Sequence, residues 1–309
     1  MSKARSTLIL FLCCLLVIFS ACEDNGDKDG GNQKVGIEMV QAAGGSFQMG
    51  KYSGTDSAED VTPLHTVTLS DFSISKYPVT QEQYGTVMAK NPSYYYGGTG
   101  REPAAGEVQK KRPVDTISWY DAIVFCNKLS RMEGLSPAYS IKNSVDPSKW
   151  GDAPTGDIND DWDAVQIVSG SNGYRLPTEA QWEYAAKGGN PNAAGWAWYA
   201  YSGSDTIGDV AWYNANSGNK THEVGKKAPN YLGLYDMTGN VYEWCWDWYG
   251  DYSGEPQTDP AGAASGAGRV LRGGSYIFSE SSARSVFRTY GYPFVADLKP
   301  GFRLVRPLR

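Results

Sequence analysis

The chain has 309 residues, a formal net charge of −6 and a pI of about 5.1. This length suits one large domain or two ordinary ones. The excess of acidic side chains gives no general attraction for a phosphate backbone, so nucleic acid is not expected as a partner. The two histidines, His65 and His222, are far apart in the sequence. This argues against a zinc or iron site built from several imidazoles.

The first 21 residues have the pattern of an export signal. Lys3 and Arg5 precede an apolar run from Leu8 to Phe19, and small residues then precede Cys22. The run is too short to span a bilayer, which needs about 20 apolar residues, although a short anchor that stays attached is the alternative. The sequence around Cys22 resembles a bacterial lipobox, and the acidic residues after it resemble the export signal of Bacteroidetes surface lipoproteins. The resemblance implies lipidation of Cys22 at the outer membrane or cell surface, with membrane contact only through the lipid.

Residues 22–34 follow as a polar stretch, CEDNGDKDGGNQK, with no apolar residue after the cysteine. Such a segment cannot offset the entropy lost on ordering, so we expect a flexible tether. Its acidic run lacks the closing glutamate of a calcium loop. We expect one domain over residues 35–309. Cys126 and Cys245 lie in apolar contexts, which favours two buried thiols over one disulfide.

Three helices are predicted by their start signals. Thr80, Ser118 and Thr178 are each followed three residues later by Gln or Asp, the pattern of a capping box. Alternating polar and apolar residues predict strands at residues 45–49 and 65–75. Residues 139–172 are rich in turn formers and predict a surface excursion. Few short helices, short strands and many aromatics indicate an irregular α+β domain.

Four motifs carry a family resemblance. The segments GYRLPTEAQWEYAAKGG from residue 173, GLYDMTGNVYEWCWDW from 233, RVLRGGSY from 269 and GFR from 301 occur in that order. Together they resemble the formylglycine-generating enzyme family, also called the sulfatase-modifying factor domain family. Matching residues extend from about 37 to 307. The resemblance implies an irregular fold related to C-type lectins.

The same resemblance bears on catalysis. In the copper-dependent oxidases of this family, two cysteines stand three and eight positions after the serine that corresponds to Ser275. Here those positions are Phe278 and Ala283, which cannot bind a soft metal as thiolates do. No copper and no family oxidase activity are therefore expected. We expect Ser275 to hold the Gly273–Gly274 turn through hydrogen bonds, because no base is identifiable nearby.

Calcium is the cofactor that the resemblance implies. In the family, side chains at the positions of Asp236 and Glu243 bind it together with carbonyls at those of Gly239 and Val241. Two carboxylates on either side of a Gly-Asn turn can provide the oxygen ligands that a hard cation prefers. The alternative is an ordinary turn capped by a carboxylate.

Exposed aromatic residues are the candidates for ligand contact. Residues 276–300 resemble the variable region of diversified ligand-binding lipoproteins of this fold and contain Tyr and Ser, which suit adaptable binding surfaces. The candidates within this segment are Tyr276, Phe278, Glu280, Ser282, Phe287, Tyr290 and Tyr292. Residues 94–96 and 196–201 offer further aromatics in loop-like sequence. Trp244, Trp246 and Trp248 alternate, which favours a strand with one buried face over a ligand platform.

The sequence leaves three functions open. The first is a non-catalytic binding lipoprotein with a protein or glycan ligand. The second is an enzyme of this family with divergent chemistry. The third is a structural lipoprotein of a gliding or secretion apparatus.

Overall fold

The computed structural model describes residues 35–51 and 61–308. The predicted signal peptide, lipidation site and tether, residues 1–34, lie outside the described residues. The described residues belong to one compact unit, in agreement with the single α+β domain expected from the sequence. No helix within the described ranges is long and apolar enough to cross a membrane.

The helices are few and short. The three with capping boxes are α1 (Gln81–Met88), α2 (Trp119–Met132) and α4 (Glu179–Ala186), and in each the predicted hydroxyl accepts from the N3 backbone N–H while the N3 side chain accepts from the N-cap N–H. This confirms the sequence prediction, since the signal is local and uses residues only three apart. Single turns form α3 (Asp160–Asp163) and α5 (Ile207–Val210).

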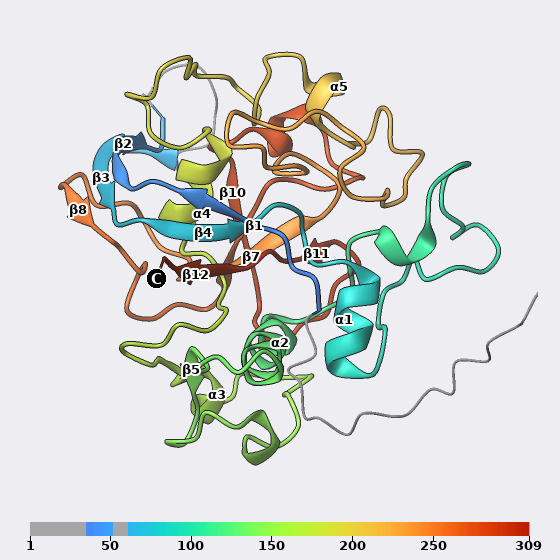
Figure 1. Cartoon of the computed structure of the whole chain (residues 1–309), viewed down its shortest axis with the longest axis vertical. Helices are drawn as coiled ribbons and strands as arrows, with labels where there is room; N and C mark the ends of the chain where they lie inside the picture. The colour runs from blue at the N-terminus through green and yellow to red at the C-terminus, as the bar shows by residue number, and fades with distance from the viewer. Residues whose placement is uncertain (1–34, 52–60, 309) are drawn as a thin grey trace, which may run out of the picture. The chain divides into compact units, whose positions relative to one another are not determined.

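The strands of the described residues form four small sheets (Figure 1). Their strand orders are β1-β4-β12, β10-β9-β7-β11, β2-β3-β8 and β5-β6. The strands are β1 (Met39–Ala42), β2 (Gly45–Met49), β3 (His65–Leu69), β4 (Phe72–Ser75), β5 (Tyr139–Ser140), β6 (Gln166–Ile167), β7 (Tyr242–Trp248), β8 (Gln257–Thr258), β9 (Arg269–Arg272), β10 (Arg288–Gly291), β11 (Pro300–Gly301) and β12 (Val305–Pro307).

The strand predicted over residues 65–75 is two strands in two different sheets. Its alternating pattern continues through the break, but Ser70 and Asp71 leave the ladder. Asp259 accepts from Ser70 N at 2.8 Å, and Asp71 accepts from Gly44 N at 2.7 Å. These partners are distant in sequence, so no local pattern could reveal the break.

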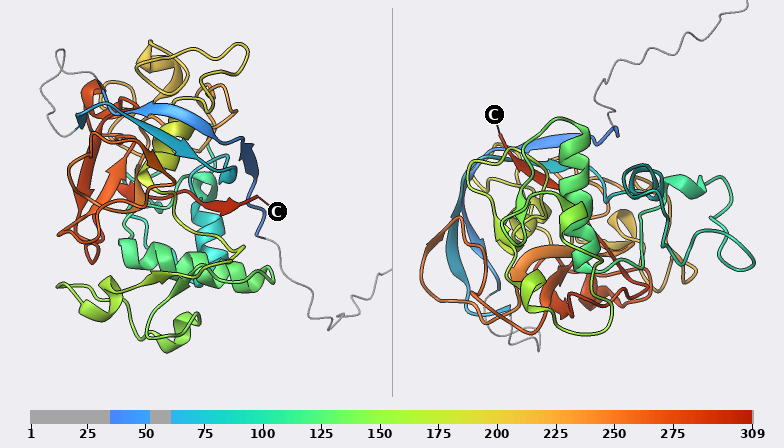
Figure 2. Two further views of the ribbon diagram at one scale, coloured as in Figure 1. Left: turned by 90° about the vertical axis from the view of Figure 1, so that its left-hand side faces the viewer. Right: turned by 90° about the horizontal axis from the view of Figure 1, so that it is seen from below.

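Residues 139–172 were predicted as a surface excursion and in fact contribute to the core. Figures 1 and 2 show this segment, which includes the β5-β6 sheet, on the far side of α2 from the three larger sheets. Tyr139, Trp150 and Trp162 are buried, and the Trp162 ring lies 5.1 Å from that of Tyr120 on α2. Aromatic side chains therefore hold a segment whose composition is otherwise typical of a loop.

Strand β7 separates two hydrophobic clusters. Trp244 belongs to the cluster around α2, and Cys245, its neighbour in the chain, belongs to the cluster around α4. Trp244 therefore packs in the core as predicted, while Trp246 and Trp248 are only partly buried. The opposite face, expected to be exposed, is also buried because Glu243, Cys245 and Asp247 lie beneath α4 and its neighbours.

Candidate functional site

Helix α4 carries buried acidic side chains that face arginines from distant strands. Glu183 is paired with Arg272 of β9, and Glu179 accepts two hydrogen bonds from Arg288 of β10, at 2.8 and 2.7 Å. Lys187 also contacts Glu183, with 2.7 Å between Nζ and Oε1. Every residue of α4 is buried. The helix is thus fixed by charges as well as by apolar packing.

A tight turn connects Asp236 to β7. Asp236 adopts a positive φ of 54° and Gly239 one of 76°. A Cβ on Gly239 would lie 2.2 Å from the carbonyl oxygen of Trp212, so only glycine fits there. Asp236 accepts from Gly225 N at 2.7 Å and from Asn240 Nδ2 at 3.2 Å. Burial raises the pKa of Asp236 to about 6.

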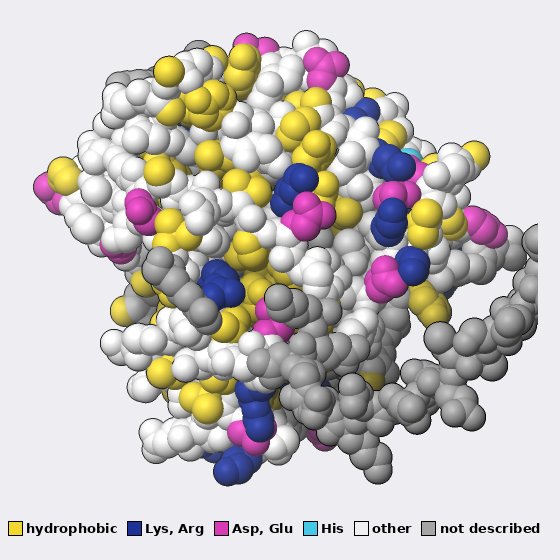
Figure 3. Space-filling model, in the orientation of Figure 1, with side chains coloured by type: hydrophobic (Ala, Val, Ile, Leu, Met, Phe, Trp, Pro, Cys, Tyr) yellow, Lys and Arg dark blue, Asp and Glu magenta, His cyan; other side chains and the backbone are white. Residues whose placement is uncertain are grey.

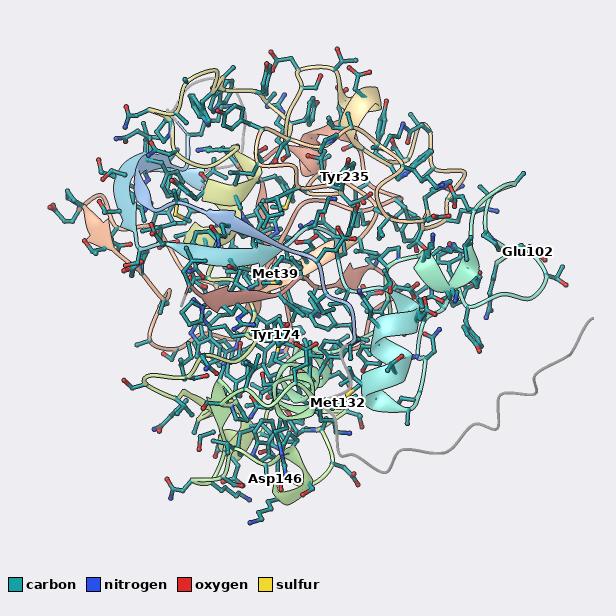
Figure 4. The ribbon with its side chains drawn as sticks, viewed as in Figure 1. Met39, Glu102, Met132, Asp146, Tyr174 and Tyr235 are labelled. Atoms are coloured by element: carbon teal, nitrogen blue, oxygen red, sulfur yellow. The ribbon has the colours of Figure 1, made fainter. Side chains whose placement is uncertain are left out.

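The carboxylate of Glu243 is fully buried and already surrounded by donors. Oε2 accepts from Trp182 Nε1 at 2.7 Å and from Arg303 Nε at 2.6 Å, and Oε1 accepts from Arg303 Nη2 at 2.8 Å. Arg303 also donates to the carbonyls of Ser75 and of Tyr235, the latter labelled in Figure 4.

These contacts allow a direct test of the calcium prediction. Calcium takes six to eight oxygen ligands, and no group of three His, Cys, Asp or Glu side chains suited to a metal occurs in the described part of the chain. A cation on Glu243 would have to share its oxygens with the Arg303 guanidinium. The arrangement therefore fits a buried ion pair beside a capped turn better than a calcium cage. Calcium at Asp236, Gly239, Val241 and Glu243 stays a prediction.

The two positions that bear thiolates in the oxidases are filled by packed apolar residues. The Phe278 ring contacts that of Tyr242, with 5.2 Å between centroids, and Ala283 is buried beside Tyr201. Ser275 is buried, but its Oγ has no hydrogen-bond partner among the described residues. The expectation that this hydroxyl secures the Gly273–Gly274 turn is wrong. The turn instead relies on the positive φ of the two glycines.

The candidate ligand residues after Ser275 separate into two groups. Tyr276 and Ser282 are buried, and Phe278 and Phe287 pack against the cluster around α2. Glu280, Tyr290 and Tyr292 are exposed, the two tyrosines by 50% and 48%. This second group offers the most exposed surface for contact with a ligand.

Tyr290 and Tyr292 belong to a continuous aromatic surface. Ring centroids are 5.0 Å apart for Tyr249 and Tyr290, 6.3 Å for Tyr290 and Tyr292, and 5.7 Å for Tyr292 and Phe294. We call these four residues the tyrosine patch. Tyr290 lies on β10, at the edge of its sheet.

The other aromatic candidates are also divided. Tyr96 is 63% exposed and Trp198 is 56% exposed, whereas Tyr95 and Tyr201 are buried. Tyr95 donates to the carbonyl of Asn219 at 2.5 Å. Residue-type composition predicted exposed aromatics in both loops, but it could not indicate which ring in each loop points outward.

The surroundings of His222, Cys126 and Cys245 indicate structural roles for these side chains. His222 lies between Glu107 and the carbonyl of Ser217, at 2.7 Å from each, and stacks on Trp212. Cys126 and Cys245 are buried free thiols, as predicted. Burial raises the pKa of both thiols well above the ordinary value, so neither is suited to act as a nucleophile.

Comparison with known proteins identifies the family. The model of the sulfatase-modifying factor enzyme 1-like domain matches residues 28–308. This chain belongs to the sulfatase-modifying factor family. A chaperone protein named LppX from Paenibacillus barcinonensis is 37% identical over 90% of this chain and 91% of its own length. The formylglycine-generating enzyme of Thermomonospora curvata is 30% identical, over 88% of this chain and 94% of its own length.

Solved structures place the fold in the same family. Treponema denticola variable protein 1 superposes with a TM-score of 0.77 and 40% identity, covering 87% of this chain and 95% of its own. CarF superposes with a TM-score of 0.68 and 30% identity, covering 89% and 100%. The sulfatase-modifying factor assignment and the irregular fold expected from the four motifs are therefore confirmed.

The charged network around α4 is the feature that the sequence analysis missed. Glu179 and Glu183 pair with arginines that are 109 and 89 positions away. A weak signal was present, because RVLR places two arginines in a short strand whose four residues are all buried. A buried arginine requires an acceptor, which the strand pattern alone could not locate.

Proposed function

We propose that this sulfatase-modifying factor protein is a non-catalytic binding module, anchored at the outer membrane or cell surface through a lipid on Cys22. The proposal rests on the residues that occupy positions 278 and 283, where the oxidases of the family have cysteines. Phe278 packs on Tyr242 and Ala283 is buried, so both positions serve the core and neither offers a ligand for copper. A family fold without its redox centre retains a rigid framework with exposed loops.

The tyrosine patch is the proposed binding face. Tyrosine supplies a large apolar ring and a hydroxyl at a low cost in conformational entropy. Tyr290 and Tyr292 each leave about half of their surface exposed, while Tyr249 and Phe294 support them from either side. A protein or glycan from outside the cell, or from its own envelope, is the proposed ligand.

Two experiments test this proposal. With copper, oxygen and a cysteine-bearing sulfatase-type peptide, the peptide mass should stay unchanged, and an aldehyde product would contradict the non-catalytic interpretation. On an array of envelope proteins and glycans, Tyr290→Ala with Tyr292→Ala should lose the signals of the unmodified protein. Tyr96→Ala, which removes a comparably exposed ring elsewhere, should retain them. Loss in both variants, or in neither, would reject the patch.

A second candidate function comes from the chaperone LppX, which aligns over nearly its whole length. A role in assisting another exported protein, or in an envelope assembly, would also use a non-catalytic binding face. If this role is correct, deletion of the protein should lower the amount of a neighbouring gene's exported product, and the Tyr290→Ala, Tyr292→Ala variant should not restore it.

A further inference from the structure

A second surface, unrelated to the tyrosine patch, has the construction of a small-ligand site. A cavity of about 630 Å³ lies between strands β2 and β3 and the loop that follows α4. This volume falls in the range of about 300 to 1,000 Å³ that small-molecule sites occupy. Figure 3 shows hydrophobic side chains gathered at the upper left of the molecule, over that loop.

The walls of the cavity are mostly apolar. Phe47, Leu64, Pro191, Trp196 and Trp198 line it. Phe47 is buried, whereas Trp198 leaves 56% of its surface exposed. Exposure of a large indole to water is unfavourable. A ligand with an apolar ring face would therefore gain the most binding free energy by covering Trp198.

The polar part of the lining consists mainly of uncharged groups. The lining includes Ser46, Gln48, Thr66 and Asn192, which have hydroxyl or amide side chains, and it includes no carboxylate residue from the described part of the chain. Such groups both donate and accept hydrogen bonds, as the hydroxyls of a ligand would require.

The charge of Lys187 is already compensated. Its Nζ lies 2.7 Å from Glu183 Oε1 and donates to the carbonyl of Gln48 at 2.8 Å. The other cation of the lining, Lys51, has its pKa lowered by burial and by the nearby Arg284. The contacts of Lys187 therefore leave its ammonium little unsatisfied charge for an anionic ligand.

The cavity is also held in shape before any ligand binds. Trp196 Nε1 donates to the carbonyl of Lys187 at 2.8 Å, which fixes one indole. On the opposite wall, Gln48 Nε2 donates to Thr66 Oγ1 at 3.0 Å across the β2–β3 pair. A preformed site loses less entropy on binding than a flexible one.

We propose that this cavity binds a sugar ring of a neutral oligosaccharide. One face of a pyranose carries C–H bonds that pack on an indole, and its edge carries hydroxyls that bond to amides and hydroxyls. Trp198 supplies the stacking surface, and Gln48 and Asn192 supply the hydrogen-bonding groups. Neutral hydrogen-bonding side chains beside an exposed indole suit a neutral sugar better than a charged ligand or a wholly apolar ligand.

Isothermal titration of the intact protein with cellotetraose, xylotetraose, mannotetraose and chitotetraose tests the proposal. At least one tetrasaccharide should bind. Trp198→Ala should raise its Kd about tenfold, which corresponds to about 1.4 kcal/mol of packing lost with the indole. Asn192→Ala should raise it about fivefold through loss of a hydrogen bond.

Matched controls separate this site from the tyrosine patch. Tyr96→Ala removes a similarly exposed ring outside the cavity, and Tyr290→Ala with Tyr292→Ala removes the patch. Neither should change the Kd for the tetrasaccharide. The proposal is overturned if no tetrasaccharide binds, if binding survives Trp198→Ala unchanged, or if indole or a tetragalacturonate binds more tightly than every neutral sugar. Because Trp198 is exposed, its variant should keep the melting temperature of the unmodified protein.

Discussion

The ion pair between Glu243 and Arg303 offers the sharpest test of how this fold is stabilised. Both side chains are fully buried. Arg303→Met would leave the Glu243 carboxylate with Trp182 as its single remaining donor in the described contacts. Breaking one partner of a buried pair costs about 3–5 kcal/mol because a charge stays buried without compensation. The carbonyls of Ser75 and Tyr235 also lose their donors, which adds to the loss.

The free energy of unfolding, measured by urea denaturation, should therefore fall by at least about 3 kcal/mol in Arg303→Met. This is a large part of the 5–15 kcal/mol typical of a domain. Glu243→Gln in the same background removes the buried charge and keeps an acceptor for Trp182, so it should recover at least about half of the loss. A loss below about 1 kcal/mol, or no recovery in the double variant, would refute this account of the pair.

Three further predictions concern the anchor, the metal and the pH dependence. Cys22→Ala should release the protein from membranes or leave an unprocessed precursor; a soluble wild-type protein without an acyl mass would contradict this. If Asp236 and Glu243 bind calcium, a chelator should lower the melting temperature, and Asp236→Asn with Glu243→Gln should abolish that sensitivity. Burial and the charge of Glu179 raise the pKa of Asp247 from 3.8 to about 7. The folded state thus holds a proton that the unfolded state releases, and stability should fall as pH rises from about 4 to about 7. Asp247→Asn should reduce that slope in urea melts.

The parts of the fold that the sequence could predict are those coded locally. Thr80, Ser118 and Thr178 start helices with partners three residues away, and the motifs that include Gly273–Gly274 identified the family. Burial was harder to predict. Glu179 and Glu183 would be expected on an exposed face of α4, yet both are buried, since their partners come from strands about one hundred residues later.

Among the candidate site residues, too, features coded locally could be predicted and features that depend on distant contacts could not. Spacing within one motif showed that Phe278 and Ala283 replace the thiolates, and this needed no structure. The direction of a side chain depends on contacts from elsewhere in the chain: Tyr276 is held inside by Tyr95, with 5.3 Å between rings, whereas Tyr290 and Tyr292 face outward. The cavity beside Trp198 likewise joins β2 with a loop about 150 residues later. An irregular fold thus brings together side chains that are far apart in the sequence, and these side chains can form a binding surface. The loops that carry them can differ in sequence while the framework stays rigid, because buried charges hold the loops in place.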